Sequence, residues 1–85
     1  MYSISITQSA LKELKQLDKP DVRKIEKLID GLAENPRPPG VKKLKGLDED
    51  VYRVRTGDYR VIYVIEDKVR IVEVRKVGHR KDIYR

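Results

Sequence analysis

The stretch VYRVRTGDYRVIYVIE, residues 51–66, decides the fold class of this chain. It contains two runs rich in Val, Ile and Tyr, residues 51–56 and 59–66, and this composition is typical of β-strands. The pair Gly57-Asp58 between the two runs favours a tight turn. After the short polar break Asp67-Lys68, residues 69–77 form a third run rich in Val and Ile. The second half of the chain therefore predicts consecutive antiparallel strands.

The first half of the chain has the periods of one strand and two helices. Residues 2–7 alternate apolar and small polar side chains, as a half-buried strand does. From Ser9 leucines recur at helical spacing, and after Asp18-Lys19-Pro20 a second apolar stripe runs until Asn35-Pro36. Residues 36–50 are expected to be a loop. The order βααβββ predicts an α+β fold, a single domain over residues 1–85 with two helices packed on an antiparallel sheet.

Composition excludes several classes of protein. The chain has 85 residues, with no Cys and one His, so it has no disulfide framework, no thiolate nucleophile and too few ligands for the usual zinc sites. No apolar run approaches the roughly 18 residues of a membrane span, and no signal-peptide pattern opens the chain. We therefore expect a soluble cytoplasmic protein that needs no cofactor or metal.

The positive charge is concentrated in one part of the chain. The formal charge of +6 makes a polyanion the first partner to consider. Residues 1–36 contain six basic and six acidic side chains, whereas residues 37–85 contain 14 basic and eight acidic ones. The whole excess of +6 therefore lies beyond the predicted helices, in the loop, the strands and the tail.

Three arginines of the predicted hairpin are expected to share one face of the sheet. If Gly57-Asp58 is a two-residue loop, Arg55 lies opposite Arg60, and Arg53 lies two residues away on the same face. Like charges placed opposite each other destabilise a hairpin, so their clustering makes sense where an anion such as phosphate binds. A solvent-exposed strand face explains the same pattern without a ligand. A three-residue loop would move Arg60 to the other face.

The hairpin and the tail together resemble the RelE toxins of the RelE/ParE superfamily. The matching segments extend over nearly the whole chain: the first strand ending in Thr7, Ala10-Leu11-Lys12-Glu13-Leu14, Asn35-Pro36, Lys42-Lys43-Leu44-Lys45-Gly46-Leu47, Tyr52-Arg53-Val54-Arg55, Gly57-Asp58-Tyr59-Arg60-Val61-Ile62-Tyr63, Val77-Gly78-His79-Arg80 and Tyr84. Their order and spacing make the resemblance fairly specific for the superfamily and less specific for one branch of it.

The resemblance implies the toxin of a type II toxin–antitoxin pair, acting as a ribosome-dependent endoribonuclease. Such toxins enter the ribosomal A site and cut the mRNA codon there, by attack of the mRNA's own 2′-OH on the adjacent phosphorus. The implied partners are the ribosome with its rRNA, mRNA, and a cognate RelB-like antitoxin. The antitoxin is expected to have an acidic or amphipathic segment that covers the basic face and the helices. The implied reaction is independent of metal.

The resemblance also implies which residues act. The functional basic residues of the hairpin fall on Arg53, Arg55 and Arg60, and the tail adds Arg80, Tyr84 and His79. Lys42, Lys43, Lys45 and Lys81 are candidate RNA contacts, because each phosphate contact adds salt-dependent affinity. For each of these residues a solvated or structural role is the competing interpretation.

The chain departs from the family pattern at the first strand of the hairpin. Where the best-known members have lysines, it has Arg53 and Arg55, and arginine does not exchange protons near neutral pH. Acid–base work would then fall to His79, Tyr84 or Lys81. A ParE-like poison of DNA gyrase and an inactive nucleic-acid-binding relative stay open as alternative functions.

Overall fold

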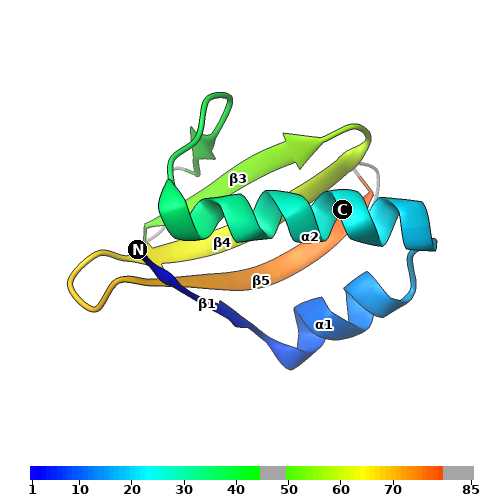
Figure 1. Ribbon diagram of the computed structural model, residues 1–85, viewed down its shortest axis with the longest axis horizontal. Coiled ribbons are helices and arrows are strands. Elements are labelled where there is room, and N and C mark those ends of the chain that lie inside the picture. Colours follow the sequence, from blue (N-terminus) through cyan, green and yellow to red (C-terminus); the bar gives the residue numbers. More distant parts are fainter. Residues whose placement is uncertain (45–49, 80–85) are drawn as a thin grey trace.

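The structure is a computed structural model and describes residues 1–44 and 50–79. Its elements are β1 (Ser3–Ile6), α1 (Gln8–Lys15), α2 (Lys19–Glu34), β2 (Lys42–Lys43), β3 (Val51–Thr56), β4 (Tyr59–Glu66) and β5 (Ile71–His79). They form one sheet in the order β1-β5-β4-β3-β2, with α2 lying across it and α1 beside it (Figure 1). The predicted α+β class, with two helices packed on a sheet, is confirmed.

Three details of the sheet differ from the sequence prediction. β1 pairs with β5 in parallel, so that the sheet is mixed although its other pairings are antiparallel. A short strand, β2, lies in the segment expected to be a loop, where two lysines between Val41 and Leu44 are too short a pattern to indicate a strand. The third predicted strand, residues 69–77, is β5, and it extends from Ile71 to His79. It starts later than predicted because the turn before it continues to Arg70, whose φ is 54°.

Both helices begin where the sequence indicates. The Thr7 hydroxyl accepts a hydrogen bond from the Ala10 backbone N–H at 3.1 Å and so caps the first turn of α1. Asp18 is the N-cap residue of α2, and Pro20 lies in the first turn, where its missing N–H is tolerated. These signals explain why two helices form here with only a short link between them.

The core lies between the helices and one face of the sheet. Its fully buried members include Ile25 and Leu32 of α2 and Val61, Tyr63, Val72, Val74 and Val77 of the sheet. The Tyr63 hydroxyl donates a hydrogen bond to the backbone oxygen of Pro36 at 2.7 Å, and burial raises the pKa of this tyrosine. Because a buried hydroxyl needs a partner, this bond fixes the chain just after α2.

A β-bulge in β5 keeps the apolar residues on the helix side. Tyr63 pairs with Val74 and Ile62 pairs with Lys76, which leaves Arg75 as an extra residue in β5. Side chains alternate along a regular strand, so Val74 and Val77, which are three positions apart, would point to opposite faces if β5 had no bulge. The bulge places both valines in the core.

Polar contacts fasten the start of the chain and the loop after α2 to the turn between β4 and β5. Arg37 donates two hydrogen bonds to the Asp67 carboxylate, at 3.2 and 2.9 Å, and its Nε donates to the Tyr52 hydroxyl at 3.2 Å. The Tyr2 hydroxyl donates to the same carboxylate at 2.6 Å. We call these four residues the Arg37 clasp; they join segments as many as 65 positions apart.

Candidate functional site

The turn Gly57-Asp58 fixes the register of the hairpin formed by β3 and β4. Gly57 has a φ of 59°, a conformation that glycine adopts readily and other residues rarely. With this two-residue loop, Thr56 lies opposite Tyr59 and Arg55 lies opposite Arg60. The predicted register is confirmed, and the alternative with a three-residue loop is wrong.

The register places three arginines on the face of the sheet that points away from the helices. Tyr52 and Val54 of β3, and Val61 of β4, belong to the core on the helix side. Side chains alternate along a strand, so Arg53, Arg55 and Arg60 point to the other side. We call these three residues the arginine face.

The members of the arginine face differ in their exposure. Arg60 is the most covered, with 6% of its surface exposed, whereas Arg53 is half-buried and Arg55 is exposed. A guanidinium group that is withdrawn from water to this degree has few conformations open to it and must be held by polar partners. Arg60 is therefore a fixed positive charge, with the mobile charge of Arg55 directly opposite.

β2 adds a lysine to the edge of the arginine face. Lys42 lies opposite Arg53, while the next residue, Lys43, lies opposite Tyr52 and belongs to the other side of the sheet. The Lys43 ammonium is 3.0 Å from the Asp50 carboxylate, which raises the pKa of the lysine. Of the two lysines, Lys42 is the one placed to contact an anion on the arginine face.

His79 lies on the opposite side of the sheet from the arginine face. It pairs with Tyr59 across β4 and β5, and the two rings meet edge to face with their centroids 5.6 Å apart. Tyr59 packs against the core and donates a hydrogen bond to Asp21 of α2 at 3.0 Å, so this pair faces the helices. The structure does not bring His79 together with the three arginines. The other predicted site residues, Lys45, Arg80, Lys81 and Tyr84, lie outside the described residues.

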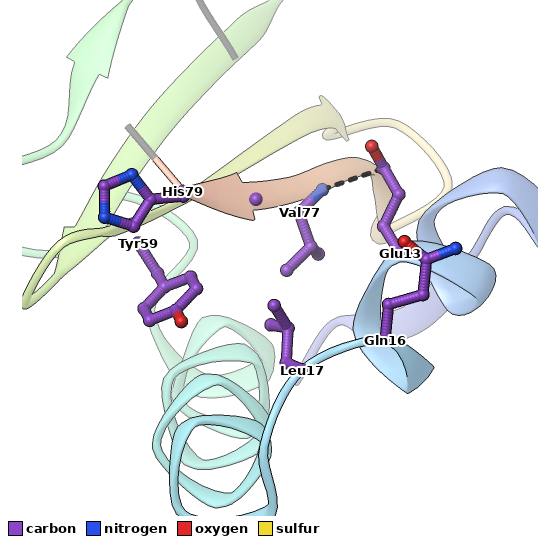
Figure 2. Close-up of a pocket in the computed structure, with 7 residues that line it drawn as sticks. Glu13, Gln16, Leu17, Tyr59, Val77 and His79 are labelled. Atoms are coloured by element: carbon purple, nitrogen blue, oxygen red, sulfur yellow. Dashed lines mark hydrogen bonds between the residues drawn. The ribbon is translucent and has the colours of Figure 1, made fainter. Parts of the chain in front are cut away.

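A pocket that the sequence did not indicate opens beside His79. It measures about 410 Å³, and Figure 2 shows His79 and Tyr59 on one side of it and the end of α1 on the other. Its lining consists of Glu13, Gln16, Leu17, Tyr59, Val77, Gly78 and His79. The Glu13 carboxylate accepts a hydrogen bond from the Val77 backbone N–H at 3.1 Å. Sequence patterns could not reveal this site, because the bond joins residues 64 positions apart.

Within residues 1–44 and 50–79, no three His, Cys, Asp or Glu side chains are grouped so that they could hold a metal ion. Neither helix in those ranges is long and apolar enough to cross a membrane.

The sequence and the fold are similar to those of known proteins. Residues 4–84 match the family described as the ParE toxin of the type II toxin–antitoxin system parDE. A Methanocaldococcus jannaschii protein assigned as the toxin RelE1 is 40% identical, over 99% of this chain and 96% of that protein. The toxin RelE of Mycobacterium tuberculosis is 34% identical, over 99% of this chain and 87% of that protein.

Solved structures with the same architecture include toxin–antitoxin complexes. The RelE–RelB complex of Pyrococcus horikoshii contains a chain that superposes with a TM-score of 0.83 at 35% identity, covering 93% of this chain and 94% of that one. The intact RelBE complex of Escherichia coli gives a TM-score of 0.81 at 28% identity, covering 93% and 96%. The chain therefore belongs to the RelE/ParE family of type II toxins. The relatives named above are RelE toxins, and the solved structures are complexes of RelE with RelB. Within the family, the chain is therefore a toxin of the RelBE type.

Proposed function

We propose that this protein is a ribosome-dependent mRNA endoribonuclease that cleaves codons in the ribosomal A site. The observation that carries the proposal is the register of the hairpin, which gathers Arg53, Arg55 and Arg60 on one face with Arg60 held almost entirely out of water. Guanidinium groups match phosphate with several fixed donors, and a buried one is preorganised for charge that develops in a transition state.

The proposed reaction is an internal transfer at one phosphodiester of the mRNA. The 2′-oxygen attacks the adjacent phosphorus as its proton leaves, and the bond from phosphorus to the 5′-oxygen breaks. The 5′-oxygen takes up a proton, so the products are a 2′,3′-cyclic phosphate and a 5′-OH. The protein must remove one proton, supply another, and stabilise the negative charge on the pentacoordinate phosphorus.

We assign charge stabilisation to Arg60 and Arg80, and binding of the RNA backbone to Arg53, Arg55 and Lys42. A single positioned donor of this kind contributes about 2.7–4 kcal/mol in other enzymes, which is a factor of 10² to 10³ in rate. Lys43, Lys45 and Lys81 are further proposed contacts to RNA, Lys43 the weakest of them because Asp50 already engages it.

We assign proton transfer to Tyr84 in preference to His79. The arrangement of His79 against Tyr59, on the side of the sheet facing the helices, argues against its reaching a phosphate bound on the arginine face. This role requires a pKa well below the ordinary tyrosine value near 10, and cations close to the hydroxyl would lower it. Action on the ribosome implies a cytoplasmic protein, and the complexes of the solved relatives support a RelB-like antitoxin as its partner.

The test is cleavage of mRNA in a translating extract, read by primer extension. We expect new 5′ ends within A-site codons, and their absence would overturn the nuclease assignment. The double variant Arg60→Ala with Arg80→Ala should lose growth arrest while it still binds antitoxin. Toxicity retained by the double variant would show that the arginines are not the site.

A gyrase poison is the second candidate function, because the matching family is described as the ParE toxin. The two candidates share a fold and differ in their target. A supercoiling assay with purified gyrase separates them: the nuclease leaves gyrase unaffected, whereas gyrase-dependent DNA breaks would establish the alternative.

A further inference from the structure

The pocket beside His79 differs in character from the arginine face. Its floor contains apolar and aromatic groups, Leu17, Val77 and the ring of Tyr59. Its wall on the α1 side carries the carboxylate of Glu13 and the amide of Gln16, which are polar groups able to fix a ligand. The pocket is open to solvent and lies on the side of the sheet that packs against the helices (Figure 2).

Carboxylates surround the aromatic part of this pocket. Asp21 accepts the Tyr59 hydroxyl hydrogen at 3.0 Å, and this bond raises the pKa of the tyrosine. The negative charges of Asp21, Asp18 and Asp58 raise it further. Acidic side chains thus act on Tyr59 at this end of the pocket, and they disfavour a polyanion such as mRNA there.

A cation with an apolar stem matches both the apolar groups and the carboxylate of this pocket. The stem of an arginine or lysine side chain would contact Leu17, Val77 and the Tyr59 ring, and its charged head would reach Glu13. Lys76 already approaches Glu13, at 3.7 Å from nitrogen to oxygen, but this ion pair is long and partly exposed. An incoming cation can compete with it.

We propose that this pocket receives a basic side chain of the antitoxin. The proposal rests on the proposed function, because it takes the antitoxin as the partner. It divides the contacts of the toxin between two sides of one sheet, with RNA on the arginine face and a cation of the antitoxin on the opposite side. The residues of this pocket would then contact the antitoxin, and the residues of the arginine face would recognise the phosphate backbone of RNA.

The first experiment uses a side-chain mimic on the whole protein. N-acetyl-arginine methylamide is titrated against the ¹⁵N-labelled chain, with N-acetyl-citrulline methylamide as its neutral isostere. We expect saturable shifts of the Leu17, Val77 and Gly78 backbone amides, with the arginine compound binding about threefold more tightly or better, the gain typical of one partly exposed charge contact. Equal binding of the two compounds, or no shifts, would overturn the proposal.

Matched variants locate the effect. Glu13→Gln and Asp21→Asn keep a hydrogen-bond acceptor at each position and remove the charge, so each should weaken binding of the arginine compound. Asp30→Asn removes an exposed charge from the same helix as Asp21 and should change nothing. Lys76→Ala removes the competing cation and should tighten binding. An equal effect of Asp30→Asn would attribute the binding to the overall charge and refute the site.

The second experiment identifies the occupant. The toxin is purified with the antitoxin encoded beside its gene, and the titration is repeated on the complex. We expect the shifts at Val77 and Gly78 to disappear, because the antitoxin fills the pocket. Undiminished binding of the arginine compound would show that the antitoxin docks elsewhere. Failure of the mRNA-cleavage assay is a separate result, because the titration does not depend on cleavage, and absence of any co-purifying antitoxin would count against the toxin assignment itself.

Discussion

Arg55 and Arg60 lie directly opposite each other in the β3–β4 hairpin, so that two guanidinium groups share one face of the sheet. This pairing opposes folding, because like charges in opposed positions repel. The pairing is expected to be retained for function, since an RNA phosphate bound between the two groups turns repulsion into attraction for both.

Replacing Arg55 should therefore stabilise the fold and weaken function. We expect Arg55→Gln to raise the free energy of unfolding by about 0.2–1 kcal/mol, the usual range for a cross-strand pair. The gain should shrink at high salt, which screens an exposed charge. Urea unfolding at low and high salt measures both effects, and mRNA cleavage by the same variant should fall. Lys12→Gln, an exposed charge on α1, is the control; a loss of stability in Arg55→Gln would contradict the repulsion.

Lys42 and Lys43 are neighbours in sequence and should differ in their contribution to RNA binding. Lys42 lies opposite Arg53 on the arginine face, whereas Asp50 holds the Lys43 ammonium at 3.0 Å. For a fluorescent single-stranded RNA, Lys42→Gln should lower the slope of log affinity against log salt by about 0.7, the value for one lost phosphate contact. Lys43→Gln should lower it less. Equal slopes for the two variants would show that the orientation of β2 does not matter for RNA binding.

The position of His79 predicts the form of the pH profile of cleavage. His79 contacts Tyr59 on the helix side of the sheet, so we expect His79→Asn to keep the shape of the profile of kcat against pH. If His79 were the proton carrier, the variant would lose one limb of the profile. Single-turnover cleavage on programmed ribosomes from pH 5.5 to 8.5 separates the two outcomes, and Tyr84→Phe is the complementary variant.

Local sequence signals predicted the hairpin and the helices well. Gly57-Asp58 indicated the turn, and a two-residue loop there predicted the register that gathers the arginines. The structure excludes the three-residue loop that the sequence left open. Pro20 marked the start of α2 through ring geometry that acts within one turn. The leucine spacing from Ser9 marked α1, which begins one residue earlier, at Gln8. Where the structure depends on neighbours close in the chain, the sequence was sufficient.

The side of the sheet occupied by His79 could not be predicted, because it depends on a bulge. His79 is five residues after Val74, and in a regular strand residues an odd number apart lie on opposite faces. Simple alternation therefore places His79 on the arginine face. The extra residue Arg75 inverts this alternation and moves His79 to the side of Val74 and the helices. The sequence around Arg75 carries no signal for the bulge, which is set by pairing with β4. The pocket and the parallel pairing of β1 with β5 likewise depend on contacts between distant segments.

The Arg37 clasp predicts how stability depends on acidity. Arg37 and, next, Tyr2 donate hydrogen bonds to Asp67 and lower the pKa of this carboxyl to about 2. Its ordinary value in an unfolded chain is near 3.9. Because the folded pKa is the lower one, the stabilisation is fully present above about pH 4 and is lost as the pH falls toward 2.

The variant Asp67→Asn isolates this contribution from those of other carboxylates. At pH 7 it should be less stable than the wild type, because Arg37 loses its charged partner, and the difference should close as the pH falls from 4 to 2. Urea unfolding at pH 7, 4 and 2.5 measures the difference, with the neighbouring exposed Glu66→Gln as the control. A gap between Asp67→Asn and the wild type that stays constant down to pH 2.5 would show that the charge of Asp67 contributes nothing. Arg37 and Tyr2 would then hold the loop after α2 through neutral hydrogen bonds and packing alone.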